Sequence, residues 1–346
     1  MVNSVNHEID LKKYDIRSDL VLDSIENNKS NIESNVYEKN EIKVTKVNIN
    51  KDNSGVINKK EGKYITIEFD DVTDSCNRDK VKEIFTDELK GMINGLNLDK
   101  DYTAIVIGLG NEKSTPDSLG PKVINNTLIT RYLYVLGEKV SNGIRCVSGI
   151  SPGVMADTGI ETVDIIFSLV NKIRPDIVIV VDALAASSIS RINKSIQITD
   201  SGIHPGSGVG NMRKEISFDT LGIPVIAIGV PTVVSSSIIV YDTLEFLFKH
   251  ISYIKDNQNK NKLIFGRKNY LNKIVNRNLS NKEKISLMGI IGSLSEDEEK
   301  DLINEVLDSL SYNFIVTPKE IDFLIDKLAE VISSGINNAL HKINVK

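Results

Sequence analysis

The chain has 346 residues, 40% of them hydrophobic, and a formal net charge of −5. That length and composition suffice for one large or two smaller globular domains with complete cores. With 42 Lys and Arg against 47 Asp and Glu, the chain has no basic excess to bind a phosphate backbone, and it has no Trp on which single-stranded bases could stack. We therefore expect no direct binding to nucleic acid.

Cysteine usage and hydropathy point to a compartment. Cys76 and Cys146 lack the C-x-x-C spacing of thiolate metal sites, and they do not make a disulfide framework. Residues 1–23 are too polar for a signal peptide, and no apolar run reaches the roughly 18 to 20 residues that span a bilayer. We expect a cytoplasmic protein with no membrane association.

The N-terminal part of the chain is mostly polar. Residues 1–23 form a short mixed-charge arm, for which a disordered tail is the plain alternative. Residues 24–62 alternate polar clusters with β-like runs, which predicts edge strands and turns. Apolar side chains in residues 79–96 have the spacing of one helix face, so we expect a helix there that covers the core.

The centre of the chain predicts a layered α/β fold. Three short runs, at residues 103–107, 177–181 and 225–228, are almost entirely apolar, which is typical of strands buried on both faces of a parallel sheet. Helical patterns at about 120–136 and 159–173 lie between them. We expect three layers around a mainly parallel central sheet, with ligands bound at the carboxyl ends of its strands.

The C-terminal part predicts a surface excursion followed by helices. A peptidase-like core at 101–250 would be followed by a polar excursion at 251–285 and a helical tail at 286–346. Capping-box patterns begin at Ser295 and at Thr317, the second with proline at the first helical position. The last helix should turn one apolar face inward, namely Ile321, Leu324, Ile325, Leu328, Ile332, Ile336 and Leu340.

Two aspartates are the strongest candidates for chemistry. Asp117 and Asp182 each come just past a buried strand, so both should lie at the same edge of the sheet. Either one alone could simply cap the turn that follows it. Together they could share a proton, so that one carboxylate activates water while the protonated partner polarises a peptide carbonyl.

Other patterns leave alternatives open. With His204 the same two aspartates could instead hold a divalent metal. Around His204, Gly206, Gly208 and Gly210 could let the backbone approach a substrate, or could form a plain flexible loop. A non-enzymatic protein that binds a nucleotide or a peptide through its glycine loops is the third alternative.

Two familiar motifs are present only in part or in form. The glycines at 108–111 begin a dinucleotide fingerprint, but Lys113 stands where its third glycine should be, so a tight turn is the plainer interpretation. The segment 149–153 formally matches the serine-hydrolase pattern around Ser151. Because Pro152 has no N–H to offer an oxyanion hole, we do not expect a serine nucleophile.

At these residues the sequence resembles the germination protease family of endospore-forming bacteria. The resemblance runs from Tyr14 to the last helix and is carried by long, ordered motifs. These are GLGN at 108–111, TPDSLGP at 115–121, PGVM at 152–155, TGIET at 158–162, DALAA at 182–186, DSGIHPGSGVGN at 200–211 and LGIPVIAIGVPT at 221–232.

The resemblance implies a self-processing endopeptidase of the spore core. Such a protease is made as a zymogen and, on germination, degrades the small acid-soluble proteins that coat spore DNA. The family's proposed catalytic aspartates match Asp117 and Asp182, and the family resembles hydrogenase maturation endopeptidases in fold. The propeptide would be residues 1–19, cut between Asp19 and Leu20, leaving 20–346 as a single peptidase domain. We also expect a homo-oligomer and no cofactor, with a divalent metal as the alternative.

Two positions depart from the family pattern. Ser235 stands where the pattern has Asp, which weakens any essential role for a third carboxylate. Asp157 stands where the pattern has Gly and adds a charge near the expected site.

Overall fold

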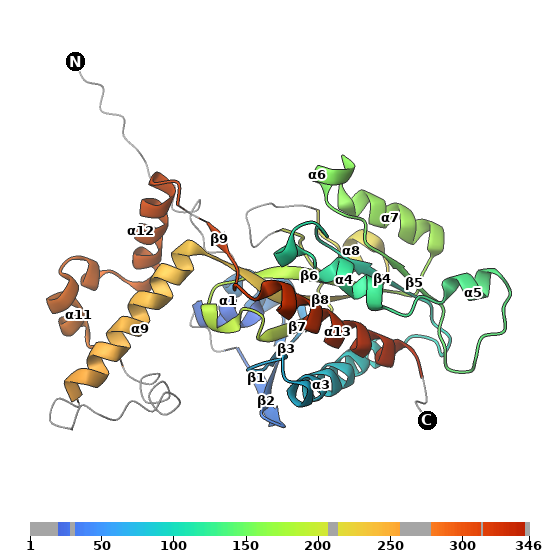
Figure 1. The fold of residues 1–346 in the computed structure, drawn as a ribbon, viewed down its shortest axis with the longest axis horizontal. Helices are drawn as coiled ribbons and strands as arrows, with labels where there is room; N and C mark the ends of the chain where they lie inside the picture. Colours follow the sequence, from blue (N-terminus) through green and yellow to red (C-terminus); the bar gives the residue numbers. More distant parts are fainter. Residues whose placement is uncertain (1–19, 28–31, 207–213, 257–277, 313, 343–346) are drawn as a thin grey trace, which may run out of the picture. The chain divides into compact units, whose positions relative to one another are not determined.

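The computed structural model describes residues 20–27, 32–206, 214–256, 278–312 and 314–342 (Figure 1). The chain divides into a larger unit, Arg17–Val233 with Thr317–Lys346, and a smaller unit, Met1–Ile16 with Val234–Val316. None of the helices in the described part is long and apolar enough to cross a membrane. The predicted division into a propeptide and one peptidase domain stays a prediction.

A central sheet forms the middle of the larger unit. Eight described strands follow one another across it in the order β1-β2-β3-β7-β8-β6-β4-β5. Their bounds are β1 (Ser34–Lys39), β2 (Ile42–Ile49), β3 (Gly62–Glu68), β4 (Ala104–Gly108), β5 (Val147–Ile150), β6 (Ile177–Ala186), β7 (Ser195–Thr199) and β8 (Val225–Ser235). The last two residues of β8 belong to the smaller unit and pair there with β9 (Ile315–Val316).

The sheet has two halves that differ in strand direction. β4 pairs in parallel with β5 and with β6, and we call these three strands the parallel half. β2 pairs antiparallel with β1 and β3, and β7 pairs antiparallel with β3 and β8, which makes the antiparallel half. The prediction of a mainly parallel sheet is therefore wrong for this second half. Apolar runs report burial on both faces, and a buried strand such as β8 can have an antiparallel neighbour.

Helices cover both faces of this sheet. Along β4, Val106 faces a core shared with α3 (Ser75–Asn94), α4 (Leu119–Asn126) and α13 (Ile321–Leu340). Ile105 and Ile107 face a second core, shared with α7 (Thr162–Ile173) and α8 (Phe218–Leu221). The alternation follows from the strand's two-residue period. The prediction of a mixed α/β fold with a central sheet and flanking helices is confirmed.

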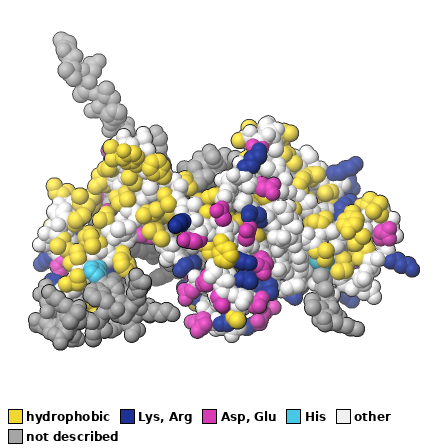
Figure 2. Space-filling model, in the orientation of Figure 1, with side chains coloured by type: hydrophobic (Ala, Val, Ile, Leu, Met, Phe, Trp, Pro, Cys, Tyr) yellow, Lys and Arg dark blue, Asp and Glu magenta, His cyan; other side chains and the backbone are white. Residues whose placement is uncertain are grey.

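One predicted helix is broken in two. The pattern at 120–136 becomes α4 and a short α5 (Arg131–Val135). The break has a local cause: Thr127 adopts an extended backbone, and the N–H of Thr130 donates to the carbonyl of Val147 in β5 at 2.9 Å. Figure 2 shows apolar side chains over α5, where Val135 and Leu136 are 70% and 71% exposed. The predictions of helices at 79–96 and 159–173 are confirmed as α3 and α7.

One of the two capping boxes forms. Ser295 caps α12 (Glu296–Ser309), and its N–H and hydroxyl both donate to Glu298. The box at Thr317 is wrong, because α13 begins only at Ile321 and the Thr317 hydroxyl donates to the carbonyl of Thr232 at 2.8 Å. The inward face of α13 is buried as predicted except at Leu324, which is half-buried.

The start of the described chain is buried rather than an arm. Leu20 directly precedes α1 (Val21–Asn27), which packs with α2 (Lys51–Ile57) against β2 and β3. The predicted arm therefore does not extend to residue 23. The turns and strands expected for 24–62 are present as β1 and β2, with α2 in addition.

In its described residues, the smaller unit is mainly helical, with the end of β8 and β9 as its strand segments. α9 (Ser236–Asp256) packs with α12, and the ammonium of Lys284 in α11 (Asn281–Met288) lies 2.6 Å from the Glu245 carboxylate. The predicted polar excursion at 251–285 falls partly in α9 and partly in α11. Its middle part, 257–277, lies outside the described residues.

Candidate functional site

Asp117 closes the loop that follows β4. It ends the short 3-10 helix η2 (Thr115–Asp117), where its N–H donates to the carbonyl of Ser114 at 2.8 Å. One oxygen of its carboxylate accepts the N–H of Asn111 at 2.9 Å, and its main-chain carbonyl accepts the same N–H at 3.1 Å. The half-buried side chain is thus held in a defined position at the carboxyl end of β4.

Glycine is required for this arrangement. Gly110 has a φ of 109°, and a Cβ at this position would lie 2.0 Å from the carbonyl oxygen of Asp117. No other residue fits there without moving Asp117. The chain bends at Gly110, and the hydrogen-bonded turn follows it, where the N–H of Ser114 donates to the carbonyl of Asn111 at 3.0 Å. The interpretation of 108–111 as a tight turn stays a prediction.

Asp182 lies inside β6, not just past it. β6 continues to Ala186, so the prediction that the strand ends before Asp182 is wrong. The expectation came from the apolar run, which stops at Val181. This is also where pairing with β4 stops, since Gly108 and Val181 are the last partners. Asp182 is only 6% exposed, and its carboxylate accepts the N–H of Ala183 at 2.9 Å.

The loop that carries Asp117 lies against the strand that carries Asp182. The N–H of Leu109 donates to the carbonyl of Val181 at 2.8 Å, directly before Asp182. η2 also contacts β6. From the other side of β4, the hydroxyl of Ser151 donates to the carbonyl of Gly108 at 3.1 Å. The segments that follow β4 and β5 therefore meet beside the part of β6 where its pairing with β4 stops. The pairing of Asp117 with Asp182 as a site stays a prediction.

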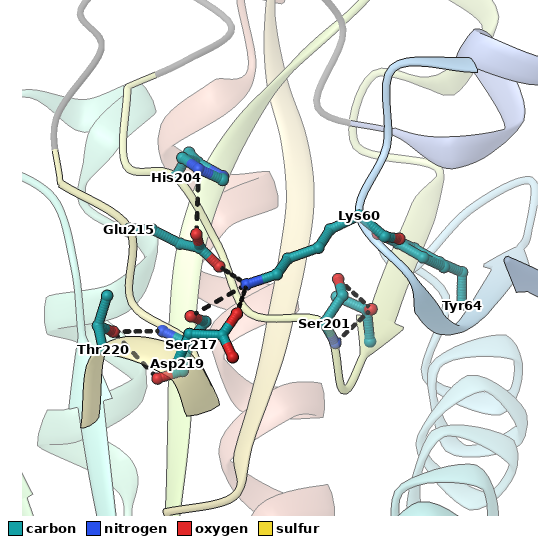
Figure 3. Close-up of polar contacts among 9 residues, drawn as sticks. Lys60, Tyr64, Ser201, His204, Glu215, Ser217, Asp219 and Thr220 are labelled. Carbon is teal, nitrogen blue, oxygen red and sulfur yellow. Dashed lines mark hydrogen bonds and ion pairs between the residues drawn. The ribbon is translucent and has the colours of Figure 1, made fainter. Parts of the chain in front are cut away.

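His204 belongs to a different group of side chains (Figure 3). Its side chain is 53% exposed, and Nε2 lies 3.5 Å from a carboxylate oxygen of Glu215. Gly206 has a φ of 72°, whereas Gly208 and Gly210 lie outside the described residues. Within the described part of the chain, no three His, Cys, Asp or Glu side chains gather in a way that could hold a metal ion. The trio with Asp117 and Asp182 is thus not assembled here.

Lys60 is the centre of the group in Figure 3. Its ammonium lies 2.5 Å from the carboxylates of both Glu215 and Asp219 and 3.3 Å from the hydroxyl of Ser217. Burial alone would lower the pKa of Lys60, but the hydrogen bonds to Asp219 and Glu215 outweigh it and raise that pKa. The sequence analysis missed Lys60. No motif links it to residues 215–219, which lie more than 150 positions away.

The predicted processing site is described on one side only. Asp19 lies outside the described residues, whereas Leu20 is 0% exposed.

Comparison with known proteins places the chain in a family. A family model described as germination protease matches residues 11–346. The chain belongs to the germination protease family. It is 44% identical to a germination protease of Priestia megaterium over 357 residues, covering 96% of each chain. It is 43% identical to that of Bacillus subtilis over 354 residues, covering 97% of this chain and 96% of the relative.

The likeness to a solved structure is weak. The match to a NiFe hydrogenase maturation protease from Thermococcus kodakarensis covers 39% of this chain and 76% of that protein's chain. The sequence identity is 17% and the TM-score is 0.25. At that score the likeness carries no argument, so the specific resemblance in fold stays a prediction.

The two departures from the family pattern have local partners. Asp157, at the end of α6 (Met155–Thr158), lies 3.3 Å from the ammonium of Lys113, which belongs to the loop that carries Asp117. The added negative charge beside the Asp117 loop is therefore paired. Ser235 shares a hydrogen bond of 2.7 Å with the hydroxyl of Ser237 in the smaller unit.

Proposed function

We propose that this member of the germination protease family is a self-processing endopeptidase. It would act in the cytoplasm of the spore core and start the breakdown of small acid-soluble DNA-binding spore proteins on germination. Family membership supports the peptidase activity. The observation that carries the choice of site is the bond from Leu109 to Val181, which sets the Asp117 loop beside Asp182.

Asp117 and Asp182 would act as an acid–base pair. One carboxylate takes a proton from the attacking water, while the protonated partner donates to the oxygen of the scissile peptide carbonyl. Collapse of the tetrahedral intermediate breaks the C–N bond, and the proton taken from water passes to the leaving amine. The partner carboxylate takes back a proton from a hydroxyl of the intermediate as the carbonyl forms again. Substrate backbone would lie along His204, Gly206, Gly208 and Gly210. The exposure of His204 and the positive φ of Gly206 support that placement.

Substitution of each aspartate tests the pair. Asp117→Asn and Asp182→Asn should fold normally and lose at least about a thousand-fold in both self-trimming and cleavage of a spore protein, because each member is needed. Asp164→Asn is the control, since that exposed carboxylate only pairs with Lys214 at 3.0 Å. Mass spectrometry of the N-terminus follows the trimming. If either variant still trims itself, the substituted residue does not belong to the mechanism.

Dialysis against a chelator tests the metal-dependent alternative. A site made of the two aspartates alone should keep its activity. Loss of activity that one divalent metal restores would favour a metal site formed by Asp117, Asp182 and His204. If the purified chain neither trims itself nor cuts any peptide, the non-enzymatic binding protein is favoured.

The chain is also proposed to form a homo-oligomer. The apolar surface on α5, at Val135 and Leu136, supports this because large exposed apolar patches mark interaction sites (Figure 2). Light scattering of the chain and of a Leu136→Asp variant should show dissociation in the variant.

A further inference from the structure

The residues just after the proposed cut are buried in the described structure. Leu20 and Val21 are 0% exposed and Leu22 is 8% exposed. Val21 and Leu22 belong to an apolar cluster of the larger unit that also contains Val47, Ile49, Ile57 and Tyr64. The first side chains on the carboxyl side of the bond to be cut are therefore part of a core.

Their main-chain groups are also occupied. The carbonyl of Leu20 accepts the N–H of Ser24 at 3.4 Å, at the first turn of α1. The N–H of Val21 donates to the side-chain oxygen of Gln197 in β7 at 2.7 Å. A peptide bound in extended form needs these same N–H and carbonyl groups for its own hydrogen bonds.

Asp23 holds residues 20–23 in place through a buried ion pair. It is 1% exposed, and its carboxylate accepts the N–H of Ser187 at 2.7 Å and pairs with the guanidinium of Arg191. Arg191 is itself 8% exposed and ends η3 (Ile189–Arg191). Arg191 also lies 3.6 Å from a carboxylate oxygen of Glu68. Loss of the Asp23 charge would leave Arg191 with this longer contact alone, which destabilises the docked state.

A docked helix is a poor substrate. Proteolysis of a folded segment commonly proceeds through a locally opened state, and its rate follows the population of that state when opening and closing are fast. α1 has 7 residues, too few for a stable helix on its own. Once undocked, the segment would become an extended chain that a peptidase site can bind.

We propose that residues 20–23 form a processing lock, which must leave its docked position before the bond between Asp19 and Leu20 is cut. The proposal rests on the proposed self-processing. The buried contacts of Val21, Leu22 and Asp23 set how often the segment opens. The lock therefore sets the rate of trimming without belonging to the peptidase site.

The test weakens the lock and follows trimming of the full-length chain. Asp23→Asn and, separately, Leu22→Ala should each trim at least about ten-fold faster than the parent, because each raises the open population. Asp52→Asn is the matched control, since this exposed acid lies on the neighbouring helix α2. Its trimming rate should not change.

A second measurement separates the lock from a positioning role. In a chain produced to begin at Leu20, Asp23→Asn should leave the cleavage rate of a separate peptide unchanged within about two-fold. If Asp23→Asn slowed both trimming and peptide cleavage, the anchor would support the peptidase site instead, and the lock would be wrong. Unchanged trimming in both variants would also overturn it.

Failure of the proposed function would look different. A parent chain that never trims contradicts self-processing but still allows the lock to be tested. An added broad-specificity protease should then cut between residues 20 and 24 at least about ten-fold faster in Asp23→Asn than in the parent. Equal rates would overturn the lock on its own.

Discussion

The two halves of the sheet carry different kinds of polar groups. In the parallel half, β4 is buried throughout, and the loop after it brings Asp117 beside the strand of Asp182. In the antiparallel half, β3 and β7 are flanked by the buried Asp23–Arg191 pair and by the cluster around Lys60. These charged groups hold segments of the chain together.

This difference shows which half of the sheet suits a catalytic site and which suits contacts that hold segments of the chain together. Parallel strands bring their carboxyl ends, and so the loops that follow them, to one edge, which gathers candidates for catalysis. Antiparallel neighbours such as β3 and β7 run in opposite directions, so the loops after them leave from opposite edges of the sheet. Segments distant in sequence then reach that part of the sheet through side-chain bonds, such as that of Gln197 to Val21.

Outside the aspartate pair itself, the largest expected effect comes from the loop of the parallel half. Gly110→Ala should lower peptidase activity by at least about a hundred-fold, because the new Cβ would lie 2.0 Å from the carbonyl of Asp117 and must displace it. Gly55→Ala in α2 is the matched control, since nothing lies within 4 Å of its added Cβ. It should keep full activity and stabilise the fold by about 0.5–1 kcal/mol. Peptidase activity and thermal unfolding would be measured for both variants. Similar activities of the two would contradict a special role of the Asp117 loop.

A smaller effect is expected on the pH dependence of the free energy of unfolding, through a histidine that lies close to the parallel half. His341 follows α13 and is 3% exposed, and its Nδ1 accepts the N–H of Arg145 at 3.0 Å. Burial lowers the pKa of His341 below its ordinary value of 6.5. The unfolded chain therefore binds this proton first, so the stability that neutral His341 contributes is complete above about pH 6.5 and is lost as pH falls below it.

Denaturant unfolding between about pH 8 and pH 5.5 measures this dependence. His341→Asn should flatten the loss of stability with falling pH relative to the parent. Parallel curves for the parent and His341→Asn would show that another group carries the dependence.

The smallest effect belongs to the antiparallel half. Lys60→Met should lower the free energy of unfolding by about 1 kcal/mol or less, because the Lys60 side chain is 35% exposed and its partner Asp219 is 70% exposed. The loss should shrink in high salt, which screens exposed charges. Lys214→Met, whose pair with Asp164 is more exposed, should change stability less. A loss for Lys60→Met that is equal at low and high salt would point to packing rather than charge.

The sequence predicted two of the three strands of the parallel half and missed β5 (Val147–Ile150). The apolar runs ending at Ile107 and Val181 located β4 and β6, and the aspartates after them were found for that reason. The same runs could not show that β8 has an antiparallel neighbour in β7, because burial on both faces does not depend on the sense of pairing. They also stopped short of the end of β6, since a polar residue such as Asp182 interrupts a run without ending the strand.

Contacts distant in sequence were missed for a different reason. The group around Lys60 and the pair of Asp23 with Arg191 join segments with no shared motif. A signal did exist for the lock: Leu20, Val21 and Leu22 are three consecutive apolar residues at the end of an otherwise polar stretch. Their burial could have been predicted from that run.

One measurement tests the central claim most directly. A chain produced to begin at Leu20 needs no trimming, so its kcat on a synthetic peptide that spans residues 14–23 reports the peptidase site alone. Asp117→Asn, Asp182→Asn and the double variant should each lose at least about a thousand-fold, with the double variant no slower than either single one, because the two residues act as a unit. A single variant that keeps more than about a tenth of the parent kcat, while folded, would contradict the paired-aspartate site.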